Sequence, residues 1–176
     1  MHKTSLRHRA LVLVVGVFAL AFGGWANADP PARIARLGYL SGAVSFSPAG
    51  EDDWLQASLN RPLTTGDRVW AEPGARTEIQ FGGATVRMSG GTGVSILNLD
   101  DQIAQLQLTQ GALNVRVRHL EPNQVFEVDT PNVAFTLRQP GEYRIAVDPG
   151  GVATSIVVRK GRGEVYADDV PFASRS

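Results

Sequence analysis

Apolar and polar residues alternate along most of this chain beyond residue 36. In the segment 77–81, for example, polar residues separate Thr77, Ile79 and Phe81. Successive side chains of a β-strand point to opposite faces, so this period of two predicts strands with one face in a core. No segment beyond residue 28 sustains the apolar spacing of a surface helix. The alternation predicts that the following side chains point inward: Ile79, Phe81, Val86, Leu106, Leu108, Leu113, Val115, Phe126, Val128, Phe135, Ile145, Ile156 and Val158.

Glycines mark the expected turns. Gly82 and Gly83 separate two alternating runs, and a two-residue glycine link permits the positive φ that tight hairpins need. A pattern of an apolar residue, two further residues, a glycine and renewed alternation occurs in residues 39–46, 108–115 and 158–165. It is typical of two strands joined by a glycine bend, although ordinary turn chemistry accounts for it equally well. These signals predict an all-β fold, a two-layer sandwich or short β-roll of about ten to twelve short strands.

The first 28 residues have the layout of a secretory signal peptide. Its parts are, in order, the basic residues Lys3, Arg7 and Arg9, the uncharged and mostly apolar run 10–22, and the A-x-A motif Ala26-Asn27-Ala28. We expect cleavage between Ala28 and Asp29, and therefore a periplasmic or secreted protein with no stable membrane span after cleavage. The alternative is an uncleaved N-terminal anchor, but the apolar run is shorter than the roughly 20 residues that cross a bilayer.

The expected organisation is a signal peptide at 1–28, a linker at 29–36, one β domain at 37–170 and a tail at 171–176. The 148 residues beyond Ala28 are enough for one domain with a sizeable core. A last strand ending near Tyr166 would leave a sheet edge unpaired. We therefore expect further sequence beyond Ser176, or a partner strand, to cover that edge.

Charge and cysteine content narrow the possible functions. The residues beyond Ala28 carry 14 basic and 17 acidic side chains, a net charge of −3, and no cysteine. This balance gives no electrostatic reason to expect nucleic-acid binding. Thirteen of the 14 basic residues are arginine, which a genome rich in G and C explains more simply than planar contacts with carboxylates or phosphates.

No catalytic, cofactor or metal site emerges from the sequence. His119 is the one histidine beyond residue 28, and without cysteine it cannot form a zinc site. No serine lies in a G-x-S-x-G motif. The glycine-rich segment 89–93 lacks the Lys and Ser or Thr of a phosphate-binding loop and leads into a strand, so it predicts a turn. Solvated turns are also expected at the acidic pairs 52–53, 100–101 and 168–169 and at the basic cluster 159–162. We therefore expect a protein that is not an enzyme and that holds no cofactor.

Gly66 and Asp67 are expected to form a structural turn. A carboxylate that follows glycine is well placed to accept backbone N–H groups. The sequence alone therefore predicts that Asp67→Ala destabilises the protein and that Asp67→Asn is nearly neutral. Trp54 and Trp70 are expected to pack against the domain rather than to hold a ligand.

Several short motifs follow one another along the chain. They are Gly42-Ala43-Val44, Trp54-Leu55-Gln56-Ala57, Leu63-Thr64-Thr65-Gly66-Asp67, Phe126-Glu127-Val128-Asp129-Thr130-Pro131 and Val158-Arg159-Lys160-Gly161. In this order, over residues 37–167, the chain resembles the FecR-like domain family. The resemblance implies a periplasmic, all-β, non-enzymatic domain of the kind found in the ferric-citrate signalling regulator and in exported proteins of unknown function. The chain departs from the family's usual Gly-Thr-aromatic at Gly141-Glu142-Tyr143 and shows no anti-sigma segment, so iron signalling is not expected.

The function that these observations favour is a non-catalytic interaction or scaffold module of the periplasm or envelope. Its partner would be an envelope protein or an additional domain of a longer chain. One alternative is a sensory domain that contacts a membrane signalling regulator, and another is a glycan-binding or hydrolytic domain. A hydrolase would need a convergent carboxylate pair or a nucleophile with its base. A glycan binder would need exposed aromatic side chains, for which the candidates are Trp54, Trp70 and Tyr166.

Overall fold

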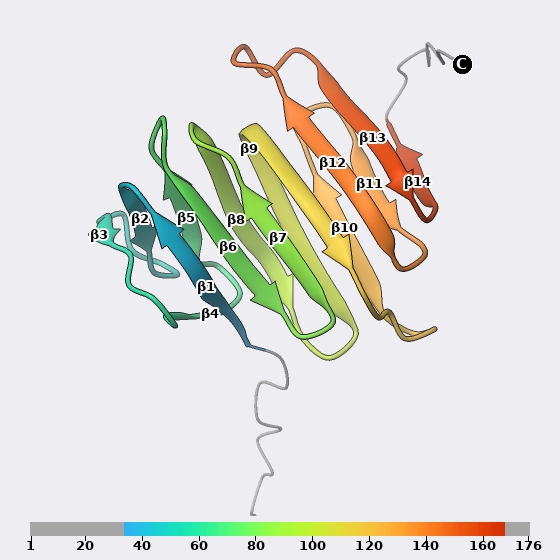
Figure 1. The fold of residues 1–176 in the computed structure, drawn as a ribbon, viewed down its shortest axis with the longest axis horizontal. Coiled ribbons are helices and arrows are strands. Elements are labelled where there is room, and N and C mark those ends of the chain that lie inside the picture. Colours follow the sequence, from blue (N-terminus) through green and yellow to red (C-terminus); the bar gives the residue numbers. More distant parts are fainter. Residues whose placement is uncertain (1–33, 168–176) are drawn as a thin grey trace, which may run out of the picture. The chain divides into compact units, whose positions relative to one another are not determined.

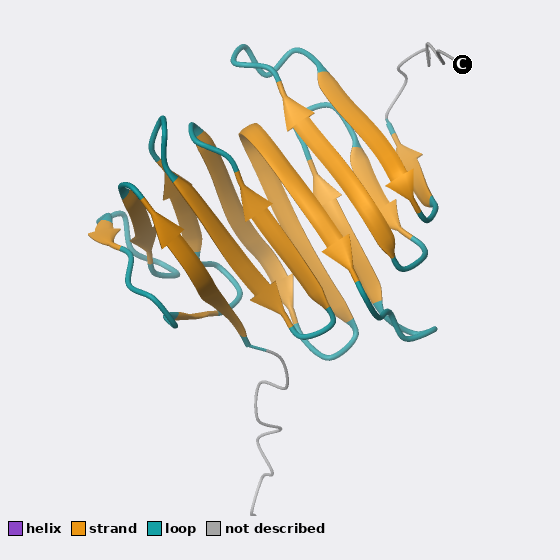
Figure 2. Ribbon diagram, viewed as in Figure 1, coloured by secondary structure: helices purple, strands orange, loops and turns teal. Residues whose placement is uncertain are grey.

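The computed structural model describes residues 34–167, and every regular element in this range is a β-strand (Figures 1 and 2). The all-β expectation is therefore confirmed. Fourteen strands form one sheet, more than the ten to twelve expected, and two of them have only two residues. They are β1 (Ala35–Ser41), β2 (Val44–Ser47), β3 (Leu55–Gln56), β4 (Pro62–Leu63), β5 (Arg68–Ala71), β6 (Arg76–Phe81), β7 (Ala84–Met88), β8 (Thr92–Leu99), β9 (Ile103–Val117), β10 (Val125–Asp129), β11 (Ala134–Leu137), β12 (Gly141–Val147), β13 (Thr154–Lys160) and β14 (Gly163–Tyr166).

The sheet folds over into two layers that face each other across the core (Figure 1). Layer A has the strand order β4-β1-β6-β7-β9-β12-β13. Layer B has the order β3-β2-β5-β8-β9-β10-β11-β14. All of these pairs are antiparallel except β9 with β10. Strand β9 belongs to both layers and joins them.

Strand β9 changes layer at Gly111. Its first part, up to Gln110, pairs with β8 in layer B, and its second part, from Gly111, pairs with β12 in layer A. The sequence pattern predicts two strands around this glycine, but the structure has one strand of 15 residues with a bend inside it. Gly111 has a φ of +90°, and a Cβ there would collide with Thr92. Only glycine has both the freedom and the small size for this bend.

The other two copies of the glycine pattern also lie where the chain changes layer. Gly42, with a φ of +77°, links β1 in layer A to β2 in layer B. Gly161, with a φ of +93°, links β13 in layer A to β14 in layer B. The recurring pattern in the sequence therefore marks the corners of the two-layer fold.

Local turns and ends agree with the sequence in most places. Strands β6 and β7 form the expected hairpin, because Phe81 pairs with Ala84 across the Gly82-Gly83 turn. Strand β1 begins at Ala35, two residues before the expected start of the domain, since Ala35 and Leu37 are both fully buried.

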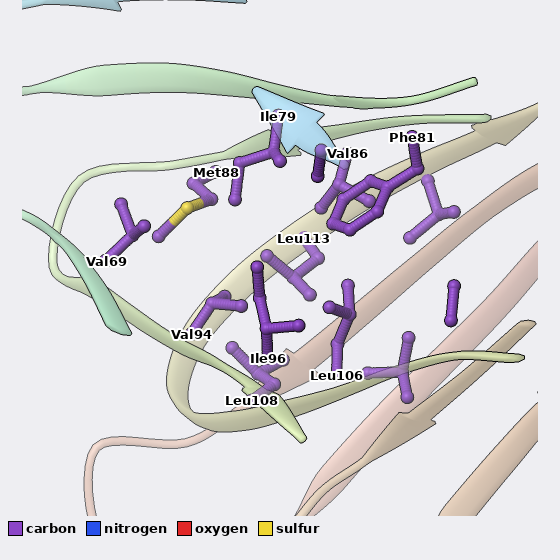
Figure 3. Packing of buried hydrophobic residues seen from close by; sticks show 14 of the residues in the cluster. Val69, Ile79, Phe81, Val86, Met88, Val94, Ile96, Leu106, Leu108 and Leu113 are labelled. Atoms are coloured by element: carbon purple, nitrogen blue, oxygen red, sulfur yellow. The ribbon is translucent and has the colours of Figure 1, made fainter. Parts of the chain in front are cut away.

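One continuous hydrophobic core fills the space between the layers (Figure 3). Phe81 of layer A meets Phe126 of layer B edge to face, with ring centroids 5.8 Å apart. Eleven of the thirteen expected inward side chains are buried, and Ile156 is partly buried against them. Val158 also points to the inner side of layer A, because it lies opposite the buried Tyr143, but its side chain is 44% exposed and not buried as expected. Val158 lies on β13, the edge strand of layer A.

Candidate functional site

The strands of layer A carry most of the basic side chains of the sheet. Seven basic and two acidic residues lie on layer A strands, whereas layer B strands carry one basic and three acidic residues. We call the seven the basic face: Arg36, Arg76, Arg87, Arg116, Arg144, Arg159 and Lys160. The strand neighbours of Arg36, Arg76, Arg87, Arg116 and Arg144 are buried, so the alternation of side chains turns these five residues to the outer surface. Arg159 follows the inward-pointing Val158, and a register shift in β13 places Lys160 opposite Glu142. The charge of the domain is therefore divided between its two outer surfaces.

Strand register brings several of these groups into rows across the sheet. Arg87 on β7 lies opposite Asn114 on β9, which lies opposite Arg144 on β12. Arg144 Nη1 donates to Asn114 Oδ1 at 3.2 Å. In the next row, Arg116 lies opposite both Thr85 and Glu142.

Two carboxylates neutralise part of the basic face. Arg87 Nε donates to Glu78 Oε2 at 2.8 Å, and Arg116 Nε lies 3.7 Å from Glu142 Oε1. Within residues 34–167, no carboxylate lies within ion-pair distance of Arg36, Arg76 or Arg159. The face therefore retains a net positive charge that is open to an incoming anion.

The basic face contains two broad hollows. One, of about 740 Å³, is lined by Arg36, Gln80, Thr85, Arg87, Arg116 and Arg118, among others. The second, of about 830 Å³, is lined by Tyr39, Arg76, Glu78, Arg87 and Asn114, among others. Guanidinium forks flanked by amides and hydroxyls suit carboxylate or phosphate oxygens.

A pair of carboxylates lies on the outer surface of layer B, and the sequence analysis did not find it. Glu127 and Asp129 are two residues apart on β10, so both point away from the core. Gln105 Nε2 donates to Glu127 Oε1 at 3.2 Å and to Asp129 Oδ2 at 2.9 Å. Thr136 Oγ1 donates to Glu127 Oε2 at 2.6 Å. These bonds hold the two carboxyl groups close together.

The charged form of Asp129 is disfavoured in this pair. Burial raises the pKa of Asp129 above its ordinary value, and the neighbouring Glu127 charge raises it further. Asp129 Oδ1 is buried without a hydrogen-bond partner among the described residues. Within residues 34–167, no third His, Asp or Glu joins such a pair to form a cluster that could hold a metal ion.

The expected turn at Gly66 and Asp67 has the predicted kind of hydrogen bonding. Asp67 Oδ2 accepts the Thr64 N–H at 2.8 Å, and Asp67 Oδ1 accepts the Ala49 N–H at 2.9 Å. Gly66 has a φ of +91° and donates its N–H to the Ile96 carbonyl at 2.7 Å. The side chain of Asp67 is buried and is not part of the basic face. The cleavage residues Ala26, Ala28 and Asp29 lie outside the described residues.

Most of the other candidate groups of the sequence lie in turns. His119 follows β9 and contacts the Glu121 carboxylate at 2.6 Å, and both side chains are exposed. Residues 89–91 turn from β7 into β8, and Thr92 and Gly93 are already buried in β8. The pairs 52–53 and 100–101 are exposed, and 168–169 lie outside the described residues.

The aromatic candidates do not form one binding platform. Trp54 is 47% exposed beside β3, and Tyr166 is 51% exposed on β14, at opposite ends of layer B. Tyr166 donates its hydroxyl to Glu164 Oε2 at 2.6 Å and accepts a bond from Arg138 Nη2 at 2.8 Å. Trp70 is half-buried and packs over Gly93.

Comparison with family models, with curated proteins and with solved structures gives no match to this chain. The resemblance to FecR-like domains therefore remains a prediction from the order of the motifs. Nothing within residues 34–167 qualifies as a membrane-spanning helix.

Proposed function

We propose that this chain is an exported, non-catalytic interaction module of the cell envelope, with a FecR-like domain, and that it binds an acidic partner through its basic face. The observation that carries the proposal is the unequal division of charge between the two layers. Seven basic residues against two acidic ones occupy the strands of layer A, although the residues beyond Ala28 carry a net charge of −3.

The contrast between local and net charge supports binding in one orientation. A negative domain repels an acidic partner over most of its surface and attracts it only at the basic face. Arg36, Arg76 and Arg159 have no ion-pair partner among the described residues, so no existing salt bridge must break when they bind a carboxylate. The same surface would serve a sensory domain that contacts a membrane regulator, which is one form of the proposed function.

The carboxylate pair on β10 is the one observation that favours the hydrolytic alternative. General acid and base catalysis by two carboxylates needs substrate between or across them. Here the Gln105 amide nitrogen occupies that position, because it binds Glu127 at 3.2 Å and Asp129 at 2.9 Å. The geometry therefore supports a bridged structural pair better than an acid and base pair.

In-cell photo-crosslinking tests the proposed surface. A crosslinkable residue at Thr85, on the outer surface of layer A, should capture a partner. The same residue at Ser95, on the outer surface of layer B and equally half-buried, should not. Replacing Arg36 and Arg116 by Gln should lower the yield from position 85 several-fold.

The matched control replaces Arg138 and Arg162 by Gln. These exposed residues lie beside β11 and β14 in layer B, so the change in net charge is the same but the basic face is intact. The control should retain the crosslink. Equal crosslinks from positions 85 and 95, equal losses in the two arginine variants, or no crosslink from either position would contradict the proposal.

A further inference from the structure

Strand β13 is the longest strand of the sheet with a free edge. It has seven residues and pairs only with β12, so one side of its backbone has no partner strand among the described residues (Figure 1). The other free edges are much shorter: β3 and β4 have two residues each, and β14 has four. Short edges resist pairing with another chain, whereas a long one invites it.

Apolar side chains are exposed along this edge. Val157 is 46% exposed on the outer surface of layer A, opposite Arg144 on β12. Val158 lies opposite the buried Tyr143, so it points to the inner side of the layer, yet it is 44% exposed. An inward-pointing valine that is almost half exposed marks a place where the core is open to solvent.

We infer that a second copy of this chain pairs antiparallel with β13, about a two-fold axis at Val157. The sequence of the strand is self-complementary in this register. Val157 faces its own copy, and Ile156 faces Val158 of the other copy, so three apolar residues in a row meet apolar residues. Beyond them, Ser155 faces Arg159 and Thr154 faces Lys160.

Charge favours the same register. Arg159 and Lys160 lie at one end of β13 and Thr154 and Ser155 at the other, so antiparallel pairing sends the two basic ends apart. The two Lys160 side chains start about 20 Å from each other, at roughly 3.4 Å per residue over six residues. That separation exceeds the Debye length of about 8–10 Å, so their repulsion is largely screened. Parallel pairing would place the same charges side by side.

Pairing would also close the open end of the core. Ile156 and Val158 of each copy lie on the inner side of layer A, so the two pairs would cover one another. Such an interface is isologous, since the same strand contributes from both copies. It goes beyond the proposed function, because the two basic faces become one surface across a continuous layer A whether or not an acidic partner is found.

Single-cysteine variants of the chain without its signal peptide test this pairing, because the native chain has no cysteine. Val157→Cys should form a disulfide-linked dimer under mild oxidation, since paired antiparallel strands bring opposite Cα atoms to about 4.5–5.5 Å, within reach of a disulfide. Leu55→Cys is the matched control, because Leu55 lies on β3 at the opposite end of the sheet and is 48% exposed.

Sedimentation equilibrium supplies the second measurement. The unmodified chain should have twice the monomer mass at high micromolar concentration. Val157→Lys, which places two charges together on the axis, should be a folded monomer, and Leu55→Lys should remain a dimer. The inference is overturned by a monomeric unmodified chain, by a dimer that survives Val157→Lys, or by equal disulfide crosslinking of the Val157→Cys and Leu55→Cys variants.

Discussion

The carboxylate of Asp67 accepts the backbone N–H of Ala49 at 2.9 Å, although the two residues are 18 positions apart in the sequence. Its second oxygen accepts the N–H of Thr64 at 2.8 Å. Ala49 follows β2, Thr64 follows β4 and Asp67 precedes β5. One buried side chain therefore links the loop after β2 to the loop between β4 and β5.

Asp67→Ala should lower the free energy of unfolding by about 2–3 kcal/mol, because it leaves two backbone N–H groups without their acceptor. The sequence alone predicts that Asp67→Asn is nearly neutral. The structure changes that expectation, since an amide has one acceptor oxygen and both carboxylate oxygens are in use; we expect a loss of about 1 kcal/mol. Urea unfolding measures both, with the exposed Asp53→Ala as control. A neutral Asp67→Ala would contradict the role of these bonds.

Leu108→Ala should cost about 2–5 kcal/mol, because Leu108 is fully buried in layer B and its removal leaves a cavity. Val152→Ala is the control, since Val152 is 80% exposed and its replacement should change stability by less than about 0.5 kcal/mol. Denaturant unfolding of the two variants checks the assignment of inner and outer positions. Similar small effects from both would mean that the core is not packed as described.

Gly111→Ala should be more damaging than the same change at another glycine with positive φ. A left-handed conformation costs an L-residue about 1–2 kcal/mol, and at Gly111 the added Cβ would also collide with Thr92 and the Gly91 carbonyl. Gly50 has a φ of +75°, but no atom lies within 4 Å of the position that a Cβ would take, so Gly50→Ala should show the conformational cost alone. Thermal unfolding of the pair separates the two effects. Equal costs would show that β9 can bend elsewhere.

Asp129 should make the protein less stable as the pH rises. Its pKa is raised in the folded state by burial and by Glu127, so the folded state holds this proton at pH values where the unfolded chain has released it. The contribution is fully present below the unfolded pKa, and it is lost as the pH rises through the folded pKa. Asp129→Asn should therefore weaken the dependence of the melting temperature on pH above the ordinary carboxyl range, as thermal unfolding at a series of pH values would show.

Glu127→Gln tests whether the Glu127 charge contributes to the pH dependence that Asp129 causes. Removing the Glu127 charge takes away one cause of the raised pKa of Asp129, so this variant should also have a flatter profile, with a smaller change than Asp129→Asn. If the melting temperature of Asp129→Asn depends on pH in the same way as that of the unmodified protein, the raised pKa of Asp129 does not affect the stability of the fold.

Export should be visible in the mass of the protein. Cleavage after Ala28 predicts a secreted chain that begins at Asp29. Intact-mass measurement of the periplasmic fraction checks this. A chain that retains Met1 and sediments with membranes would instead indicate an uncleaved anchor.

The alternation of apolar and polar residues predicted well which side chains point into the core. In a two-layer β fold one face of each strand is buried, and successive side chains point to opposite faces. At Val158 the alternation predicted the inward direction correctly but not the burial, because this residue lies on the edge strand β13 and is 44% exposed. It also split β9 into two strands, since a glycine bend inside a strand and a turn between strands have the same local pattern.

The basic face and the carboxylate pair on β10 depend on which strands lie side by side, and the sequence does not reveal the strand order. The basic face collects residues from six strands, so no window of sequence is unusually basic. The period of two alone could have placed Glu127 and Asp129 on one side of β10. It could not have brought Gln105 to them, because that contact follows from the parallel pairing of β9 with β10.

Strand β9 supplies a central strand to both layers with the same 15 residues. Opening it would remove the middle of each layer at once, so the domain should unfold as a single cooperative unit rather than layer by layer. A partner that binds only to layer A would therefore raise the unfolding free energy of layer B by the same amount. The two outer surfaces differ in charge, but the layers that carry them have one common free energy of unfolding, because β9 belongs to both.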